Sequence, residues 1–193
     1  MSTVAGLATR ERLLAAAREL IEDDGYGSAS VTAITERAGV AAGTVYRHFA
    51  SKAELFLDVF RDVCAGEERA MVAAADDAGP DAVDRLEAVL TTFARRALQN
   101  PRLAWALLAE PVDQLVDAER LAYRERYAAL VARELRAAID AREIPAQDVE
   151  FMAAALVGGC GEALVGPLSS VSDADTVIAS IRTFVRRAIG APA

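Results

Sequence analysis

The chain of 193 residues has one histidine, His48, and two cysteines, Cys64 and Cys160. With one histidine, neither a histidine metal cluster nor a Ser-His or Cys-His catalytic pair can be assembled away from His48. The two cysteines stand far apart in the sequence and lack any paired spacing. We therefore expect a reducing, cytoplasmic environment and no disulfide framework.

Sequence motifs of common enzymes are missing as well. The chain has no G-x-S-x-G elbow, no P-loop and no H-E-x-x-H pair, and Gly25-x-Gly27 lacks the third glycine of a dinucleotide fingerprint. We expect neither an enzyme nor a bound cofactor or metal. No apolar run follows a basic start, so no signal peptide is predicted. The longest uncharged apolar run, residues 151–161, falls short of the ~18 residues that span a bilayer, which predicts a soluble protein.

Apolar residues, many of them alanine, make up 53% of the chain, and no segment alternates with a period of two. This composition predicts an all-α protein of about nine helices, after a loose arm over residues 1–8. The net charge of -8 argues against nucleic acid at first, but DNA binding depends on a local patch rather than on the total. The expected helices are 9–24, 31–38, 42–49, 52–75, 81–98, 101–110, 117–142, 148–165 and 174–189.

Residues 30–52 read as two short helices joined by a tight turn, followed by the start of a third helix. Ser30 suits the N-cap of the first helix, and Gly39 suits the left-handed residue that ends it. Val45 and Phe49 lie one turn apart on the buried side of the second helix. Two helices across a short turn, with polar side chains facing outward from the second, predict a helix-turn-helix.

The string AGVAAGTVYRHFASKAEL resembles the TetR family of transcriptional regulators, whose pattern runs roughly A-G-V-S-x-G-T-L-Y-x-H-F-x-x-K-x-x-L. Two positions depart from the family's usual residues. Ala41 replaces a capping serine, at a cost of about 1 kcal/mol to the second helix, and Thr35 replaces an alanine at the packing point between the helices. The matching residues, in one unbroken register, are Gly39, Val40, Gly43, Thr44, Tyr46, His48, Phe49, Lys52 and Leu55.

The resemblance implies that residues 30–52 contact DNA. Within residues 27–53, Arg37, Arg47 and Lys52 outnumber the single acid Glu36. Phosphate contacts fall to Thr44, Tyr46, His48 and Lys52, with hydroxyl contacts from Ser30 and Thr32. Base contacts fall to Thr44, to Arg47 as the candidate guanine contact, and to the backbone near Ala42 and Gly43. Taken singly, Tyr46 suits packing and Arg47 a solvated surface; together at this spacing they favour DNA.

The last two predicted helices are candidates for a dimer interface. Glycines within a helix cost about 1 kcal/mol each relative to alanine, and close approach by another helix compensates for that cost. The two helices alone fit a core equally well, but TetR-like proteins dimerise through their last two helices, and two copies match two half-sites of DNA. The candidate interface residues are Ala154, Gly158, Gly161, Val177, Ile181, Phe184 and Ala188.

We expect a DNA-binding domain over residues 1–56 and a ligand-binding and dimerisation domain over residues 57–193. Aromatic and charged residues near apolar runs are candidates to line a small-molecule cavity in the second domain. Aromatic residues at helical spacing are more often simply core, so this alternative stays open. The candidates are Phe93, Trp105, Glu110, Tyr123, Arg126, Tyr127, Phe151 and Glu162.

The resemblance implies a regulator that binds a two-fold symmetric operator as a homodimer and acts as a repressor released by a small molecule. Release requires that the ligand bind the DNA-incompetent arrangement more tightly. The alternative is a helical small-molecule-binding or scaffold protein that does not bind an operator, which the acidic total charge also suits. Salt dependence separates the two, because affinity for DNA falls steeply as salt rises.

Overall fold

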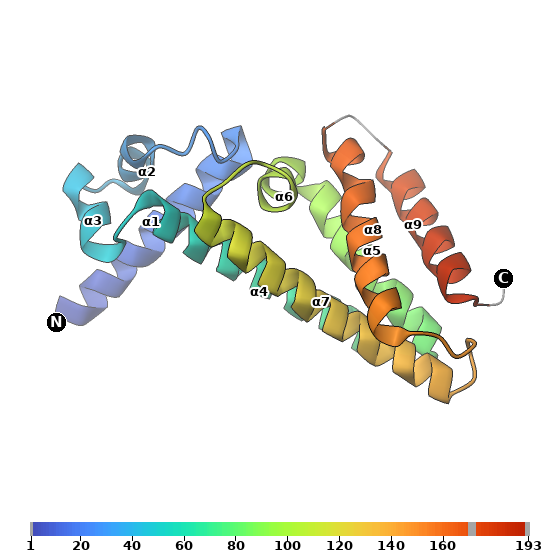
Figure 1. Cartoon of the computed structure of the whole chain (residues 1–193). Coiled ribbons are helices and arrows are strands. Elements are labelled where there is room, and N and C mark those ends of the chain that lie inside the picture. The colour runs from blue at the N-terminus through green and yellow to red at the C-terminus, as the bar shows by residue number, and fades with distance from the viewer. Residues whose placement is uncertain (1, 170–172, 192–193) are drawn as a thin grey trace. The chain divides into compact units, whose positions relative to one another are not determined.

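The computed structural model describes residues 2–169 and 173–191, and every regular element within these ranges is a helix (Figure 1). The all-α fold predicted from the composition is confirmed, as are nine α-helices in the described part of the chain. The elements are α1 (Ser2–Asp24), α2 (Val31–Ala38), the 3-10 turn η1 (Ala42–Thr44), α3 (Val45–His48), α4 (Lys52–Asp77), α5 (Ala82–Gln99), α6 (Pro101–Leu108), α7 (Gln114–Asp140), α8 (Val149–Ser169) and α9 (Ala174–Ile189).

Two helices, α1 and α8, run well beyond the bounds that the sequence pattern predicts. The loose arm expected over residues 1–8 is wrong for residues 2–8, because α1 already begins at Ser2; extending an existing helix costs far less than nucleating one. The end of α8 expected near residue 165 is also wrong, since the helix continues through Gly166 and Pro167. Pro167 lies near the end of the helix, where its missing N–H removes a single backbone bond. The gap expected between the helices 148–165 and 174–189 falls partly on residues 170–172, outside the described residues.

The chain divides into two compact units. Unit 1 comprises residues 1–63 and 102–120, and unit 2 comprises residues 64–101 and 121–193. The domains expected at 1–56 and 57–193 stay a prediction. Unit 1 differs from the first of them because residues 102–120, which hold α6 and the start of α7, pack with the N-terminal helices.

Unit 1 has a core of its own. The apolar positions of α1, α2, α3 and α4 recur at helical spacing, and α1 packs against α2. Burying each large side chain of this kind contributes about 1.5–3 kcal/mol. The fully or almost fully buried apolar residues are Leu13, Ala17, Ile21, Ala29, Ile34, Val45, Phe49, Leu55, Phe56, Val59, Phe60, Ala106 and Val116.

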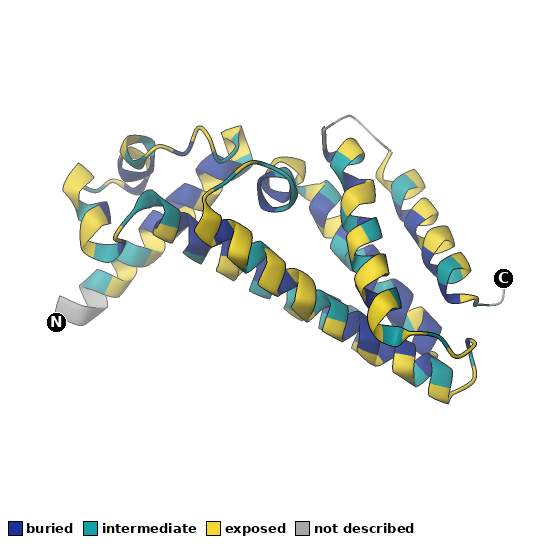
Figure 2. Cartoon of the chain, viewed as in Figure 1, coloured by how far each residue is buried: buried dark blue, intermediate teal, exposed yellow. Residues whose placement is uncertain are grey.

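In unit 2, α5 packs against both α8 and α9, which also contact each other (Figure 1). The core includes Leu86, Val89, Leu135, Leu156, Leu164, Val185 and Ile189. Cys160 is buried with them, and burial raises the pKa of its thiol to about 11. The other side of α8 and of α9 carries many exposed positions (Figure 2).

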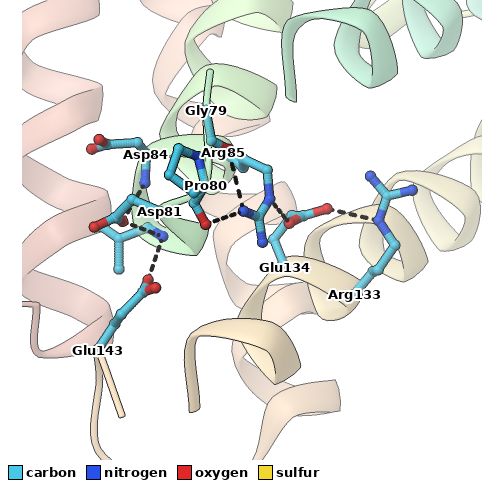
Figure 3. Close-up of polar contacts among 9 residues, drawn as sticks. Gly79, Pro80, Asp81, Asp84, Arg85, Arg133, Glu134 and Glu143 are labelled. Atoms are coloured by element: carbon cyan, nitrogen blue, oxygen red, sulfur yellow. Dashed lines mark hydrogen bonds and ion pairs between the residues drawn. The ribbon is translucent and has the colours of Figure 1, made fainter. Parts of the chain in front are cut away.

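Charged groups fix the start of α5 (Figure 3). The N–H of Val83 donates to Asp81 Oδ1 and to Glu143 Oε2, both at 3.0 Å, so two carboxylates cap the helix. Arg85 donates from Nε to Glu134 Oε2 at 2.8 Å, and Glu134 is only 3% exposed. A buried carboxylate requires such a partner because an unpaired buried charge is very costly.

Candidate nucleic-acid interface

Helix α2 begins and ends as its sequence predicts. The Ser30 hydroxyl accepts a hydrogen bond from the Ala33 N–H at 3.1 Å, which makes Ser30 the N-cap. Gly39 has a φ of 63°, the left-handed conformation expected of the residue after a helix. Its position is also held from outside, because Arg12 Nη2 donates to the carbonyls of Ala38 and Gly39.

The second helix of the motif differs from the prediction of one continuous helix over residues 42–49. It starts as the 3-10 turn η1 and becomes α-helical only from Val45 to His48. Ala41 stands at the N-cap with no side chain able to accept a hydrogen bond, so the first turn lacks the bond that a serine supplies. The buried side is as predicted, since Val45 is 0% exposed and Phe49 2% exposed.

The outward side of η1 and α3 carries the residues expected to meet DNA. Tyr46 is 62% exposed, Arg47 is exposed, and Thr44 and His48 are half-buried. Ala42 and Gly43 are exposed, and a Cβ added at Gly43 would meet no atom within 4 Å, so the backbone is open to close approach. At the start of α2, Ser30 and Thr32 are exposed as well.

Among the nine lysines and arginines of unit 1, all within the described residues, Arg47 stands apart because it has no hydrogen bond, ion pair or ring contact to the described chain. An exposed guanidinium with no partner keeps all its donors available for a ligand. The partnered cations are Arg10 with Asp58, Arg12 with two carbonyls, Arg18 with Glu22, Arg37 with Asp23, Lys52 with Tyr26, Arg61 with Glu119, Arg102 with Asp24 and Arg120 with Asp117.

Lys52 is therefore placed differently from Arg47. Its Nζ donates to the Tyr26 carbonyl at 3.3 Å and lies 4.4 Å from the centre of the Tyr26 ring. Burial lowers the pKa of Lys52, and the nearby carboxylate of Glu110 acts in the opposite direction. Four side chains are expected to contact phosphate: Thr44, Tyr46, His48 and Lys52. Within the described chain, only Lys52 among them has both a hydrogen bond and a ring contact to another residue.

Comparison with known proteins places this geometry in a family. Residues 13–59 match the family model described as "Bacterial regulatory proteins, tetR family", a range that contains α2, η1 and α3. This segment is similar to the TetR family over the length of that model. The resemblance found in residues 39–55 is thereby confirmed.

Curated relatives agree with the TetR-family assignment over part of their length. The HTH-type transcriptional regulator UidR of Escherichia coli (strain K12) is 40% identical over 63 residues, which cover 33% of this chain and 31% of UidR. The HTH-type transcriptional repressor KstR of Rhodococcus jostii (strain RHA1) is 31% identical over 98 residues, or 51% of this chain and 45% of KstR. The chain thus spans less than half the length of these two relatives.

One solved structure extends the likeness of fold to nearly the whole chain. The transcriptional regulator FadR from Bacillus subtilis, in complex with stearoyl-CoA, aligns with a TM-score of 0.77 over 91% of this chain and 96% of FadR. The sequence identity is 21%, so the two share a fold. The TetR-like arrangement of an N-terminal helix-turn-helix followed by a helical bundle is thereby confirmed.

The candidate ligand residues fall into three groups. Trp105 and Glu110 are half-buried in unit 1, whereas Phe151 and Glu162 are exposed in unit 2. Phe93, Tyr123 and Tyr127 pack together in unit 2, with ring centres 5.9 Å apart in each neighbouring pair, and Arg126 lies 4.7 Å from the Tyr123 ring.

Within this aromatic cluster, the Tyr127 hydroxyl donates to the Cys64 carbonyl at 3.1 Å. Burial raises the pKa of Tyr127 strongly, and the contact with Cys64 adds to this, so the hydroxyl stays protonated. Arg126 pairs with Glu68 at 2.5 Å. The cluster therefore has the polar groups at its edge already satisfied, and its role in ligand binding stays a prediction.

The candidate dimer residues lie on two sides of their helices. Ala154, Gly158 and Phe184 are exposed, Gly161, Val177 and Ala188 are half-buried, and Ile181 is 4% exposed within the core of its own unit. Gly159, rather than its exposed neighbours, explains the close packing of α8 with α9, because a Cβ added there would lie 3.2 Å from Phe184 Cζ. A shallow groove on α9 is lined by Thr176, Ala179, Ser180, Thr183, Phe184, Arg187 and Ala188.

Sequence reasoning missed two side chains that shape the interface from behind. Arg12 braces the end of α2, and Tyr26 lies between Phe56 and Lys52, with its ring centre 4.1 Å from that of Phe56. The packing role of Tyr26 could have been predicted from the sequence, because an aromatic residue between two glycines of a turn suggests packing. The role of Arg12 could not have been predicted, because an arginine on the outer face of α1 looks like any solvated charge.

Proposed function

We propose that this chain is a ligand-responsive transcriptional regulator that binds double-stranded DNA as a homodimer and acts as a repressor released by a small molecule. The observation that carries the proposal is Arg47, exposed and without a partner in the described chain, beside the exposed Tyr46 on a helix that Val45 anchors. A planar guanidinium matches the O6 and N7 acceptors of guanine in the major groove.

The surrounding residues supply the contacts that orient such a helix. We assign phosphate contacts to Thr44, Tyr46 and His48, which can donate hydrogen bonds without reading sequence. Ser30 and Thr32 lie at the start of α2, where backbone N–H groups and the helix dipole also favour a phosphate. The open backbone at Ala42 and Gly43 allows the close approach that base contacts need.

The homodimer is supported by the exposed apolar side of α8. Phe151 is 70% exposed, and Ala154, Ala155 and Gly158 are exposed on the same helix. The segment Val149–Leu168 is long and apolar enough to cross a membrane, with 28% of its 18-residue window buried. We assign its free side to a second copy rather than to lipid, because its other side is committed to α5 and α9, and α9 carries Arg182 and Arg187 on its exposed face.

The small-molecule effector belongs to unit 2 in this proposal. FadR from Bacillus subtilis, which shares the fold, was solved in complex with stearoyl-CoA. We place the effector of this chain beside Phe93, Tyr123 and Tyr127, because these candidate residues form an aromatic cluster in unit 2, and we leave its chemical class open. A ligand that displaces DNA must bind the DNA-free arrangement better, and by linkage DNA weakens the ligand by the same factor.

The remaining expectations form part of the same proposal. The protein is not an enzyme, works in the cytoplasm and does not engage a membrane. The alternative is a helical ligand-binding or scaffold protein that does not bind an operator. An acidic protein with no DNA site would show weak affinity for DNA and little sequence preference even at low salt.

The deciding experiment is selection of bound fragments from a random pool of duplex DNA. We expect a two-fold symmetric site whose half-sites lie one helical turn, or a multiple of it, apart. Arg47→Ala should relax preference at one base pair of each half-site by about 1–3 kcal/mol and leave the other positions unchanged. Failure of the wild-type chain to enrich any sequence at low salt would favour the alternative, and a uniform loss for Arg47→Ala would remove its base-reading role.

A further inference from the structure

The turn between α1 and α2 is held from two sides by charged groups. It consists of Gly25, Tyr26 and Gly27, and it sets the direction in which the chain enters α2. Gly25 has a φ of 83°, which L side chains rarely adopt, and its N–H donates to the Ile21 carbonyl at 3.0 Å. The two N–H groups that follow have no helical partner and need acceptors from elsewhere in the protein.

Glu110 supplies both acceptors. Its Oε2 accepts from the Tyr26 N–H at 3.1 Å, and its Oε1 accepts from the Gly27 N–H at 3.2 Å. Glu110 lies 84 residues further along the chain, in the segment between α6 and α7. Arg120 fixes that segment in turn, because its Nη2 donates to the Glu110 carbonyl at 3.1 Å and its Nε donates to the Leu107 carbonyl at 2.7 Å.

Lys52, at the start of α4, holds the same turn from its other side. Its ammonium is shared between the Tyr26 carbonyl and the face of the Tyr26 ring. The ring is itself packed on Phe56 of α4. The Glu110 carboxylate therefore accepts hydrogen bonds from two N–H groups of the turn, while Lys52 donates to the Tyr26 carbonyl. The negative charge of Glu110 and the positive charge of Lys52 attract each other across the turn. Turning the Lys52 ammonium away from the turn to reach a DNA phosphate would give up the Tyr26 carbonyl and the face of the Tyr26 ring.

We infer that Lys52 and Glu110 are paired positioning residues of the DNA-binding unit, and that Lys52 serves this purpose in place of contacting a phosphate. The inference rests on the proposed function, and it changes the role that the family resemblance implies for Lys52. It also places a residue that the DNA-binding surface depends on outside the segment 13–59 that the family model matches.

The first test uses a substitution for which electrostatics and a positioning role predict opposite changes in DNA affinity. Glu110→Gln removes a negative charge from a unit that binds a polyanion, so electrostatics alone would tighten DNA binding. A positioning role predicts the reverse, because the amide nitrogen of glutamine faces one of the two N–H groups and one hydrogen bond is lost. We expect Glu110→Gln to bind the selected operator about tenfold more weakly than wild type. Glu36→Gln, at an exposed carboxylate of α2, is the matched control and should bind as tightly as wild type or more tightly.

Lys52→Met tests the other partner through salt dependence. A residue that contacts a phosphate contributes about 0.9 to the slope of log affinity against log salt. We expect Lys52→Met to weaken binding while the slope between about 50 and about 200 mM salt stays at the wild-type value. A slope reduced by about 0.9, together with Glu110→Gln binding at least as tightly as wild type, would overturn the inference and return Lys52 to the phosphate.

Amide hydrogen exchange keeps the inference separate from the proposed function. In the full-length protein without DNA, Glu110→Gln should speed exchange at the Tyr26 and Gly27 amides, with the amides of α9 unchanged. If wild type fails to bind DNA but this local effect is present, the proposed function fails while the positioning of the turn stands. If exchange at both amides is unchanged, Glu110 does not hold the turn and the inference fails.

Discussion

The exposed side of η1 and α3 in unit 1 and the exposed side of α8 in unit 2 have opposite chemistry. The first presents Arg47, Tyr46 and open backbone, with its apolar residues turned inward. The second presents Phe151 and a row of alanine and glycine residues. The exposed side of η1 and α3 therefore suits a polar, charged partner, and the exposed side of α8 suits an apolar one. The difference depends on which side of each helix is buried in the core.

The largest effect is expected from placing a charge on the exposed apolar side of α8. Phe151→Asp puts a carboxylate where we propose that a second copy packs, while the exposed position and its place in the first turn of α8 spare the monomer. We expect the dimer dissociation constant to rise about 100-fold, equivalent to about 2.7 kcal/mol, measured by sedimentation equilibrium. Operator binding should weaken in parallel, since it requires both copies.

Leu121→Asp is the matched control for that experiment. Leu121 is 59% exposed on α7, outside the proposed interface, and receives the same change of charge. It should leave the dimer intact, and Arg47→Ala should do so as well while losing base preference. A dimer weakened equally by Leu121→Asp and Phe151→Asp would mean that added charge, rather than a lost contact, causes the effect.

A second comparison, within the described residues of unit 1, separates cations that hold the fold from Arg47, which has no partner there. Arg12→Ala removes the hydrogen bonds to the carbonyls at the end of α2, and we expect it to lower the free energy of unfolding by about 1 kcal/mol. Arg47→Ala removes no contact of the described chain and should leave stability unchanged. Urea titration of both variants checks this; equal destabilisation would show that Arg47 has a structural partner after all.

Supplying the N-cap side chain that η1 lacks should give a smaller effect, a gain in the free energy of unfolding. Ala41→Ser supplies a hydroxyl at an N-cap whose backbone is already extended, with φ of -68° and ψ of 144°. We expect about 0.5 kcal/mol of added stability, at the low end for such caps because the turn that follows is short. Urea titration measures the gain, and Ala42→Ser, one residue later, is the control that should not reproduce it.

Local features of this fold could be read from the sequence, and long-range pairings could not. Ser30, Gly39, Val45 and Phe49 behave as predicted because caps, left-handed glycines and buried positions depend on near neighbours. Lys52 was expected to contact DNA and Glu110 a ligand, and both roles stay predictions. Their actual neighbour is Tyr26, and contacts between residues so far apart in sequence follow from tertiary packing, on which local patterns are silent.

The smallest effect concerns pH and the start of α9. Asp173 caps this helix by accepting from the Thr176 hydroxyl and the Thr176 N–H, and these bonds lower the pKa of Asp173 below its ordinary value of 3.8. The carboxylate therefore stabilises the folded state fully above pH 3.8, and this contribution is lost as the pH falls through the lower pKa of the folded state. Asp173→Asn keeps a capping oxygen that does not titrate, so the protection of the amides at the start of α9, measured relative to their intrinsic exchange rates, should fall in acid in wild type and stay constant in the variant. An identical acid response in both proteins would assign it to other carboxylates.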